Sequence, residues 1–231
     1  MSVHERAFGG HSGERPVRIP AGTVTLEGSL AIPAGACAVI LFAHGSGSSR
    51  HSPRNRFVAH TLYQAGLATL LMDLLTRQEE DADAAAGHLR FDIPFLAERL
   101  AAATDWLLAN HDTRSLRIGY FGASTGAAAA LVAAVRRPAA VGAIVSRGGR
   151  PDLAGPVVAQ VQVPTLLIVG EEDRTVRGLN QEALKRLHGE KDLAIVPGAT
   201  HLFEEPGTLE EVARLATGWF VRHLMPPRPR A

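Results

Sequence analysis

The sequence has few of the features that mark extracellular or membrane proteins. It has a single cysteine, Cys37, among 231 residues, so no disulfide can form within the chain. No apolar run approaches the roughly 20 residues that a membrane-spanning helix needs. Residues 1–15 begin with Met1 and lack the apolar stretch of a secretory signal. We therefore expect a cytoplasmic protein, since a lone cysteine suits a reducing compartment.

The sequence also lacks an excess of charge of either sign. Its 24 Lys and Arg residues and 23 Asp and Glu residues give a formal net charge of +1, and no dense basic run occurs. We expect neither a nucleic-acid nor a membrane partner. The H-E-x-x-H pattern, paired cysteines and the Gly-rich nucleotide-binding patterns are absent as well. We expect no metal and no cofactor.

What is present is an alternation of short apolar runs and longer helical patterns. Hydrophobic residues make up 46% of the chain, enough for one sizeable core. The predicted strands are residues 23–32, 38–43, 67–73, 117–121, 141–145, 165–169 and 193–196. The predicted helices are residues 55–65, 91–110, 124–136, 179–188 and 209–224. This order predicts an α/β fold with a mostly parallel central sheet and helices on both faces.

No repeat or linker divides the chain, so we expect a single domain over residues 17–225. Residues 1–16 are expected to be a flexible N-terminal segment, and residues 226–231 a Pro/Arg tail. The acidic, Ala-rich residues 78–87 are expected to form a long flexible surface loop. The oligomeric state stays open, a homodimer included.

Ser124 is the predicted nucleophile. It lies in a G-x-S-x-G pattern, directly after a predicted strand and directly before a predicted helix. In that context the turn exposes the serine hydroxyl above the sheet edge, and Gly122 and Gly126 allow strand and helix to pack closely. The helix N-terminus adds a positive field where an oxyanion would form. A Gly-rich helix start of purely structural use is the alternative.

A serine needs a base, and the base needs a group to orient it. His201 follows the strand 193–196 and precedes the last helix, so it is the predicted base rather than a helix cap. Asp173 follows the strand 165–169 and is the predicted acid. The order Ser, Asp, His is that of the α/β-hydrolase layout. Glu171, Glu172 and, less favourably, Asp152 remain alternatives for the acid.

The oxyanion hole is predicted to use two backbone N–H groups. One belongs to Thr125 and the other to the loop 43–50, with Ser46 preferred over Gly45 or Gly47. A phosphate-cradling role for this loop is a rival interpretation that the missing Lys of that pattern disfavours. His44 is expected to hold the loop by hydrogen bonds rather than to act as a second base.

These motifs together resemble the α/β-hydrolase superfamily, and the compact length resembles its dienelactone hydrolase branch. The resemblance covers about residues 17–224. It implies ester hydrolysis through an acyl-enzyme, without cofactor, on a small-molecule ester. Dienelactone hydrolases proper carry a cysteine nucleophile where this chain has Ser124, and Cys37 is not placed to replace it. The serine therefore indicates a general carboxylesterase rather than a lactone-specific enzyme.

Other activities fit the same residues. A thioesterase, lactonase, amidase or perhydrolase would use the same triad, and a non-catalytic binding protein could share the fold. The segment between the strands 141–145 and 165–169 is too short for a large lid, which favours small or exposed acyl groups. Arg50, Arg147 and Arg150 could bind a substrate carboxylate. Alternatively they are solvated, or pair with Asp73 and Asp152.

Overall fold

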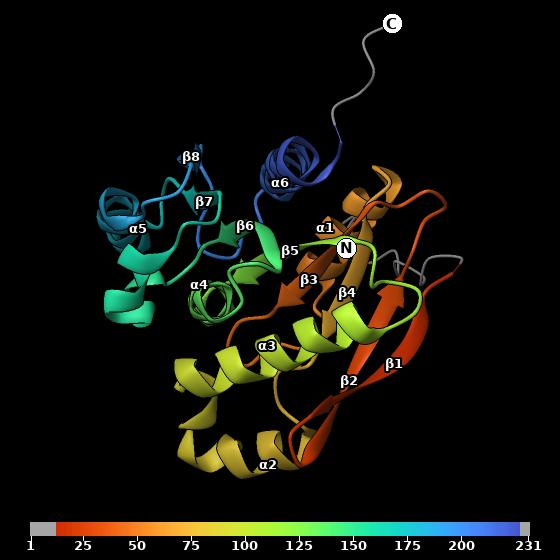
Figure 1. The fold of residues 1–231 in the computed structure, drawn as a ribbon. Coiled ribbons are helices and arrows are strands. Elements are labelled where there is room, and N and C mark those ends of the chain that lie inside the picture. The colour runs from red at the N-terminus through yellow and green to blue at the C-terminus, as the bar shows by residue number, and fades with distance from the viewer. Residues whose placement is uncertain (1–12, 227–231) are drawn as a thin grey trace, which may run out of the picture.

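A computed structural model describes residues 13–226 and shows one eight-stranded sheet between two layers of helices (Figure 1). The strands are β1 (Arg15–Ala21), β2 (Val24–Ala31), β3 (Ala38–Ala43), β4 (Ala68–Met72), β5 (Arg117–Ala123), β6 (Val141–Arg147), β7 (Thr165–Gly170) and β8 (Lys191–Val196). Their order across the sheet is β1-β2-β4-β3-β5-β6-β7-β8. The strands from β4 to β8 in this order run parallel to one another. Strand β2 pairs antiparallel with both of its neighbours, β1 and β4. The predicted α/β fold class is confirmed.

Helices cover both faces of this sheet. They are α1 (Pro53–Gln64), α2 (Arg77–Ala86), η2 (Leu89–Phe91), α3 (Ile93–Ala109), α4 (Thr125–Arg136), η3 (Pro151–Gln160), α5 (Arg174–Arg186) and α6 (Thr208–Leu224). One apolar cluster joins the sheet to α1 and α6, and a second, on the other face, joins it to α3, α4 and η3 (Figure 1). Because both faces are covered, β3, β4 and β7 are buried along their whole length, which explains their unbroken apolar sequences.

The segment 78–87 is not the flexible loop that its acidic composition suggested. It forms α2, which begins at a capping box: Thr76 Oγ1 accepts from the N–H of Glu79, and the Glu79 carboxylate accepts from the N–H of Thr76. The helix ends at Gly87, which has a left-handed conformation. Caps of this kind satisfy backbone N–H and C=O groups at the ends of a helix. Helix α2 is therefore stabilised by local hydrogen bonds, although it has no apolar stripe to pack against the core.

The described chain begins and ends close to the expected domain boundaries. Strand β1 starts at Arg15, inside the segment 1–16 that was expected to be flexible, because it pairs with β2 in antiparallel register. Most of that segment and most of the Pro/Arg tail lie outside the described residues. Within residues 13–226, no helix combines the length and the apolar character needed to cross a bilayer.

The connection between β6 and β7 holds no lid domain. It consists of η3 and short turns, and η3 packs against α4 and α5. The chain bends at Gly155, whose positive φ of 57° lets two short helical turns follow one another. The carboxyl ends of the strands, where sites form in α/β sheets, are therefore left without a helical cover from this connection.

Candidate active site

Ser124 occupies a sharp turn between β5 and α4. Its φ of 50° and ψ of −120° are rare for a residue with a side chain. The turn is held by three backbone hydrogen bonds: the Ser124 N–H donates to Arg147 O (3.3 Å), and Ser124 O accepts from the N–H groups of Ala127 and Arg150 (3.1 Å each). Hydrogen bonds to both the N–H and the C=O of Ser124 therefore hold the residue in its strained conformation.

The two glycines of the pattern allow this turn to pack. A Cβ on Gly126 would lie 2.2 Å from Ala43 O, and one on Gly122 would lie 2.5 Å from Ala127 Cα. Both distances are far inside van der Waals contact, so any side chain would push α4 away from the sheet. The glycines thus have the steric role that the sequence pattern predicts.

His201 and Asp173 meet across the carboxyl edge of the sheet. Asp173 directly follows the turn after β7 and precedes α5, while His201 lies in the loop between β8 and α6. The His201 Nδ1 lies 2.6 Å from Asp173 Oδ2. The aspartate side chain is 13% exposed and the histidine 39%. In this geometry Nδ1–H donates to the Asp173 carboxylate, which leaves the lone pair of Nε2 free to accept a proton.

The other acids considered from the sequence have different partners. Glu171 accepts a hydrogen bond from the N–H of Gly198, and Asp152 binds the guanidinium of Arg150. Glu172 lies 3.9 Å from Arg174. In the part of the chain that the structure describes, none of the three is hydrogen-bonded to His201, so the geometry favours Asp173.

Ser124 and His201 lie on neighbouring segments. Gly148, directly after the Arg147 that binds the Ser124 amide, sits against the imidazole: a Cβ there would be 3.5 Å from Nδ1 and Cε1. No hydrogen bond joins Ser124 to His201 among the described residues. Catalytic hydrogen bonds of this kind are often long in the free enzyme and tighten when substrate binds.

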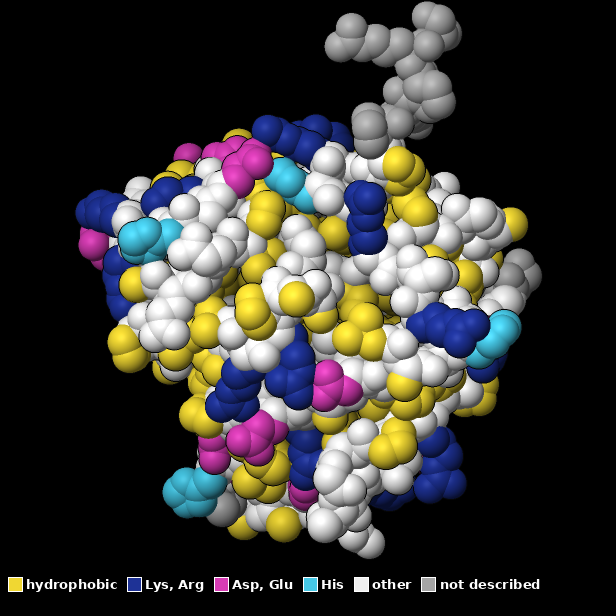
Figure 2. All heavy atoms as spheres, in the orientation of Figure 1, with side chains coloured by type: hydrophobic (Ala, Val, Ile, Leu, Met, Phe, Trp, Pro, Cys, Tyr) yellow, Lys and Arg dark blue, Asp and Glu magenta, His cyan; other side chains and the backbone are white. Residues whose placement is uncertain are grey.

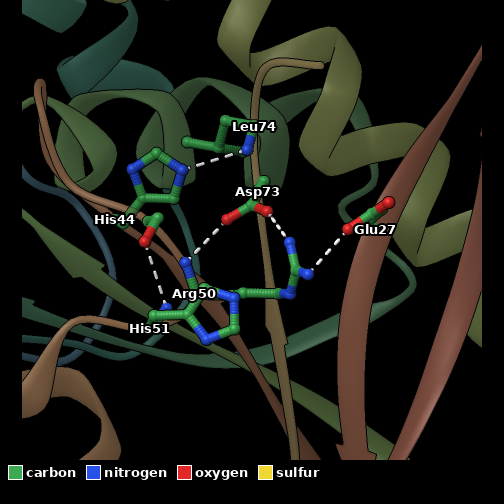
Figure 3. A network of polar contacts seen from close by, with 7 residues as sticks. Glu27, His44, Arg50, His51, Asp73 and Leu74 are labelled. Carbon is green, nitrogen blue, oxygen red and sulfur yellow. Dashed lines mark hydrogen bonds and ion pairs between the residues drawn. The ribbon is translucent and has the colours of Figure 1, made fainter. Parts of the chain in front are cut away.

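The loop before α1 is fixed by His44 and Arg50 (Figure 3). His44 Nε2 accepts from the N–H of Leu74 (3.0 Å), which leaves Nδ1–H to donate to Gly45 O (2.9 Å). Burial lowers the pKa of His44, so the ring stays neutral in this arrangement. Arg50 holds the other end of the loop through Asp73 and Glu27, which its guanidinium bridges. His44 therefore has the loop-holding contacts expected of it.

Ser46 and Thr125, the predicted oxyanion donors, contact each other. The Ser46 N–H donates to Thr125 Oγ1 at 2.9 Å. Gly45 lies against the nucleophile, since a Cβ on it would be 3.0 Å from Ser124 Cβ. The two segments are thus adjacent to Ser124, but in this structure the Ser46 amide is bound by the threonine hydroxyl. A substrate oxygen would have to take over or share that donor.

The three arginines singled out from the sequence differ in their surroundings. Arg50 forms ion pairs with Asp73 and Glu27, and Arg150 forms a two-pronged ion pair with Asp152 (2.9 and 2.7 Å). These are the structural pairs that were the alternative interpretation. Arg147 is buried instead, and its Nε and Nη1 have no hydrogen-bond partner in the described residues.

Sequence reasoning did not single out Arg54, which lies in the first turn of α1. Its Nε is also buried without a partner in the described residues, and its Nη1 donates to Glu204 Oε1 (2.9 Å). It lines a cavity of about 610 Å³ that also touches Gly45, Ser46 and Thr125. The sequence places several arginines in this region and gives no sign of which of them lacks an acidic partner.

The outer surface shows no broad area of one charge on the face in Figure 2, where acidic and basic side chains lie among neutral ones. Within residues 13–226, no three His, Cys, Asp or Glu side chains gather as metal ligands would. The group of residues at the carboxyl edge of the sheet is therefore the best candidate site on chemical grounds.

A family comparison relates the chain to known proteins. The model of the dienelactone hydrolase family matches residues 26–219, a span that contains Ser124, Asp173 and His201. The chain belongs to the dienelactone hydrolase family. The chain has the fold of that family, and its strand-to-helix turn after β5 carries Ser124. Cys37 directly precedes β3, at the opposite end of the sheet from Ser124.

Solved structures show the same similarity. A dienelactone hydrolase from Anabaena variabilis is 59% identical, with a TM-score of 0.90 over 91% of this chain and 98% of that one. Est1E from Butyrivibrio proteoclasticus has a TM-score of 0.74 at 16% identity over 90% of this chain and 98% of its own, which shows the fold alone. An α/β serine hydrolase without a lid from Xanthomonas campestris has a TM-score of 0.71 at 17% identity, over 93% of this chain and 97% of its own. This similarity also shows the fold alone.

Curated relatives from Mycobacterium tuberculosis are 56% identical over 216 residues, which is 94% of this chain and 48% of theirs. They are named putative phosphoribosyl transferases. The chain spans about half the length of these relatives. More than half of each lies outside the match, so the transferase name is not carried over to this family member.

Proposed function

We propose that this member of the dienelactone hydrolase family is a serine hydrolase that cleaves carboxylic esters with small or exposed acyl groups. The observation that carries the proposal is the placement of a strained serine, Ser124, at a strand-to-helix turn beside an imidazole that is itself oriented by a carboxylate. Family membership supplies hydrolysis, and the serine in place of cysteine favours simple esters.

The chemistry follows from the geometry. His201 Nε2 accepts the hydroxyl proton of Ser124 as Oγ attacks the ester carbonyl, and Asp173 stabilises the imidazolium through Nδ1. The negative charge on the former carbonyl oxygen meets the N–H of Thr125 at the start of α4 and the N–H of Ser46. His201 then protonates the leaving alcohol. A water molecule, deprotonated by the same histidine, releases the acid from the acyl-enzyme.

A fluorophosphonate probe with p-nitrophenyl butyrate as substrate tests this proposal. We expect the wild-type protein to be labelled once and to cleave the ester. Ser124→Ala should lose both properties, with kcat lower by roughly 10⁴-fold or more. Ser146→Ala is a matched control, because Ser146 is a buried serine on the next strand whose Oγ has no partner in the described residues.

Labelling that persists in Ser124→Ala would contradict the assignment of the nucleophile. A wild-type protein that resists the probe and cleaves no activated ester would contradict the hydrolase proposal as a whole and favour a binding role for the fold. Thioesters and lactones in the same panel decide whether the ester class is the preferred one.

A further inference from the structure

The buried face of α5 carries an amide at a position where an apolar side chain would be expected. Its buried residues are Val176, Asn180 and Ala183, and their spacing is that of a helix face packed against a core. Asn180 is fully buried. Asparagine is a poor helix former, and a buried amide is costly unless it is hydrogen-bonded. Packing alone therefore does not explain this residue, and its hydrogen bonds must be considered.

The amide nitrogen of Asn180 bridges two backbone carbonyls. Nδ2 donates to Val176 O, one turn earlier in the same helix, at 2.8 Å, and to Gly149 O at 2.9 Å. Both partners are acceptors, so the side chain must present its NH₂ group to them. Gly149 lies in the 148–150 segment, which joins β6 to η3. Asn180 thus ties α5 to a segment that is distant in the sequence.

The 148–150 segment contacts two of the candidate catalytic residues. The N–H of Arg150 donates to Ser124 O at 3.1 Å. Gly148 lies against the imidazole of His201, since a Cβ on this glycine would be 3.5 Å from Nδ1. A shift of the segment would therefore disturb both the turn that carries the nucleophile and the surroundings of the base.

The 148–150 segment is largely buried and depends on outside contacts for its conformation. Gly148, with a positive φ of 52°, is followed by Gly149, and two adjacent glycines give the backbone little preference of its own. The N–H of Gly148 donates to Ile168 O of β7 at 2.8 Å. The carbonyl of Gly149 has the Asn180 amide as its partner. Without that amide a buried carbonyl would be unsatisfied, and the peptide would have to rotate or shift to find another donor.

Helix α5 also connects Asn180 to the candidate acid. Asp173 lies directly before α5, about two helical turns before Asn180, and its carbonyl accepts from the N–H of Arg177 at 2.8 Å. The helix lies beside β7 (Figure 1) and packs against it and against η3. One rigid helix thus has the acid at its start and the anchor of the 148–150 segment further along.

We infer that Asn180 is a positioning residue, whose amide fixes the 148–150 segment and through it the alignment of Ser124 with His201. The inference rests on the proposed function, since this alignment matters only if the two residues react with an ester. Asn180 does not touch the reacting atoms. A misplacement of about 1 Å at a reacting group can lower a rate by about 100-fold, so the loss of the amide should act on kcat rather than on substrate binding.

Asn180→Leu keeps a similar side-chain volume and removes both hydrogen bonds. For p-nitrophenyl butyrate we expect kcat to fall by about 10- to 100-fold and KM to change by less than about 3-fold. The rate constant for labelling of Ser124 by the fluorophosphonate probe should fall by a similar factor. Asn180→Ser is the second variant, because a serine hydroxyl can bond to the carbonyl of Val176 but is too short to reach Gly149. It should show the same loss even if Asn180→Leu does not fold.

Thr165→Val is the matched control. Thr165 is fully buried at the start of β7, and its Oγ1 donates to Val163 O at 2.8 Å. Valine therefore also removes a buried hydrogen bond to a backbone carbonyl, at the end of β7 opposite to Asp173. We expect this variant to unfold at lower urea concentration than wild type and to keep kcat within about 3-fold.

Hydrogen exchange followed by mass spectrometry tests the positioning apart from catalysis. Peptides that contain Ser124 or Arg150 should exchange faster in both Asn180 variants than in the wild-type protein, because the backbone hydrogen bonds between them would open more often. The same peptides should exchange at the wild-type rate in Thr165→Val.

The inference is overturned if both Asn180 variants keep kcat within about 3-fold of wild type, if the loss lies in KM alone, or if Thr165→Val loses as much activity. Unchanged exchange in the peptides with Ser124 and Arg150 overturns it as well. If the wild-type protein neither reacts with the probe nor cleaves the ester, the proposed function fails, and hydrogen exchange still decides whether Asn180 fixes the 148–150 segment.

Discussion

Among the acidic residues considered, Asp173 differs from the others by its direct contact with the imidazole of His201. Its carboxylate holds Nδ1 of His201 at 2.6 Å. In Asp173→Asn the amide NH₂ can donate to Nδ1, which favours the tautomer with its proton on Nε2, and the neutral amide no longer stabilises the imidazolium. We expect kcat for p-nitrophenyl butyrate to fall by roughly 10⁴-fold with unchanged folding by circular dichroism.

Glu172→Gln is the control for that measurement, because it removes a neighbouring charge whose nearest cation, Arg174, is 3.9 Å away. It should change kcat by less than about 3-fold. A larger loss in Glu172→Gln than in Asp173→Asn would move the acid to the neighbouring position.

His44 makes stability depend on pH. Burial lowers its pKa in the folded chain below the ordinary 6.5, so on acidification the unfolded chain takes up a proton before the folded one does. The free energy of unfolding should therefore fall as the pH drops below about 6.5. Urea denaturation at pH 7.5 and 5.5 should show a smaller drop for His44→Gln than for wild type. His111→Gln, at a well-exposed side chain, should keep the wild-type drop.

Arg54 shows what single-residue reasoning could not predict. Ser124, Asp173 and His201 could be predicted as candidates from the sequence because each lies in the segment after a strand and their order is informative. Whether an arginine is paired depends on which carboxylates the fold brings near it. Arg50 and Arg150 pair with Asp73 and Asp152, whereas Arg147 and Arg54 each keep a buried guanidinium nitrogen without a partner in the described residues. No local pattern contains that information.

Among the elements, the junction of β3, β5 and α4 tolerates the least change. Gly126→Ala would place a Cβ 2.2 Å from Ala43 O and 2.4 Å from His44 O, both backbone atoms. The helix would have to move, carrying the Thr125 N–H away from the site. We expect the free energy of unfolding to fall by about 1–3 kcal/mol or more in urea denaturation, together with loss of the proposed hydrolysis of p-nitrophenyl butyrate.

Gly218→Ala is the matched change in a helix without such contacts. Nothing lies within 4 Å of the added Cβ, and the position is inside α6. We expect stabilisation by about 0.5–1 kcal/mol from the better helix propensity of alanine. Equal destabilisation by the two substitutions would show that close packing at Gly126 is not the reason for its glycine.

Two elements were missed or misread from sequence for identifiable reasons. Strand β1 contains Pro16 and Pro20, which interrupt the pattern of a strand although an edge position tolerates them. Helix α2 has no apolar stripe, so its periodicity gave no signal. The informative feature was Thr76 three residues before Glu79, with Gly87 at the far end. The buried parallel strands were predicted well because burial on both faces requires continuous apolar sequence.

For the whole molecule, the open carboxyl edge sets the expected substrate size. The β6–β7 connection supplies no cover, and the cavity beside the loop is lined by serines and charged residues as well as by leucines. A long acyl chain would find little apolar surface, although each buried CH₂ group could contribute about 0.8 kcal/mol. We expect kcat/KM for p-nitrophenyl butyrate to exceed that for the laurate. A steady rise from butyrate to laurate would contradict this.

The order of the strands also bears on how the molecules behave at high concentration. The sheet ends at β1 on one side and β8 on the other, and an exposed edge is where a neighbouring chain could add a strand and start aggregation. In β1, Pro16 and Pro20 have no N–H to offer. In β8, Lys191 and Asp192 are exposed, and the Leu193 amide donates to the Asp192 carboxylate. Both borders of the sheet are thus poor templates for polymerisation, which should keep the folded protein dispersed.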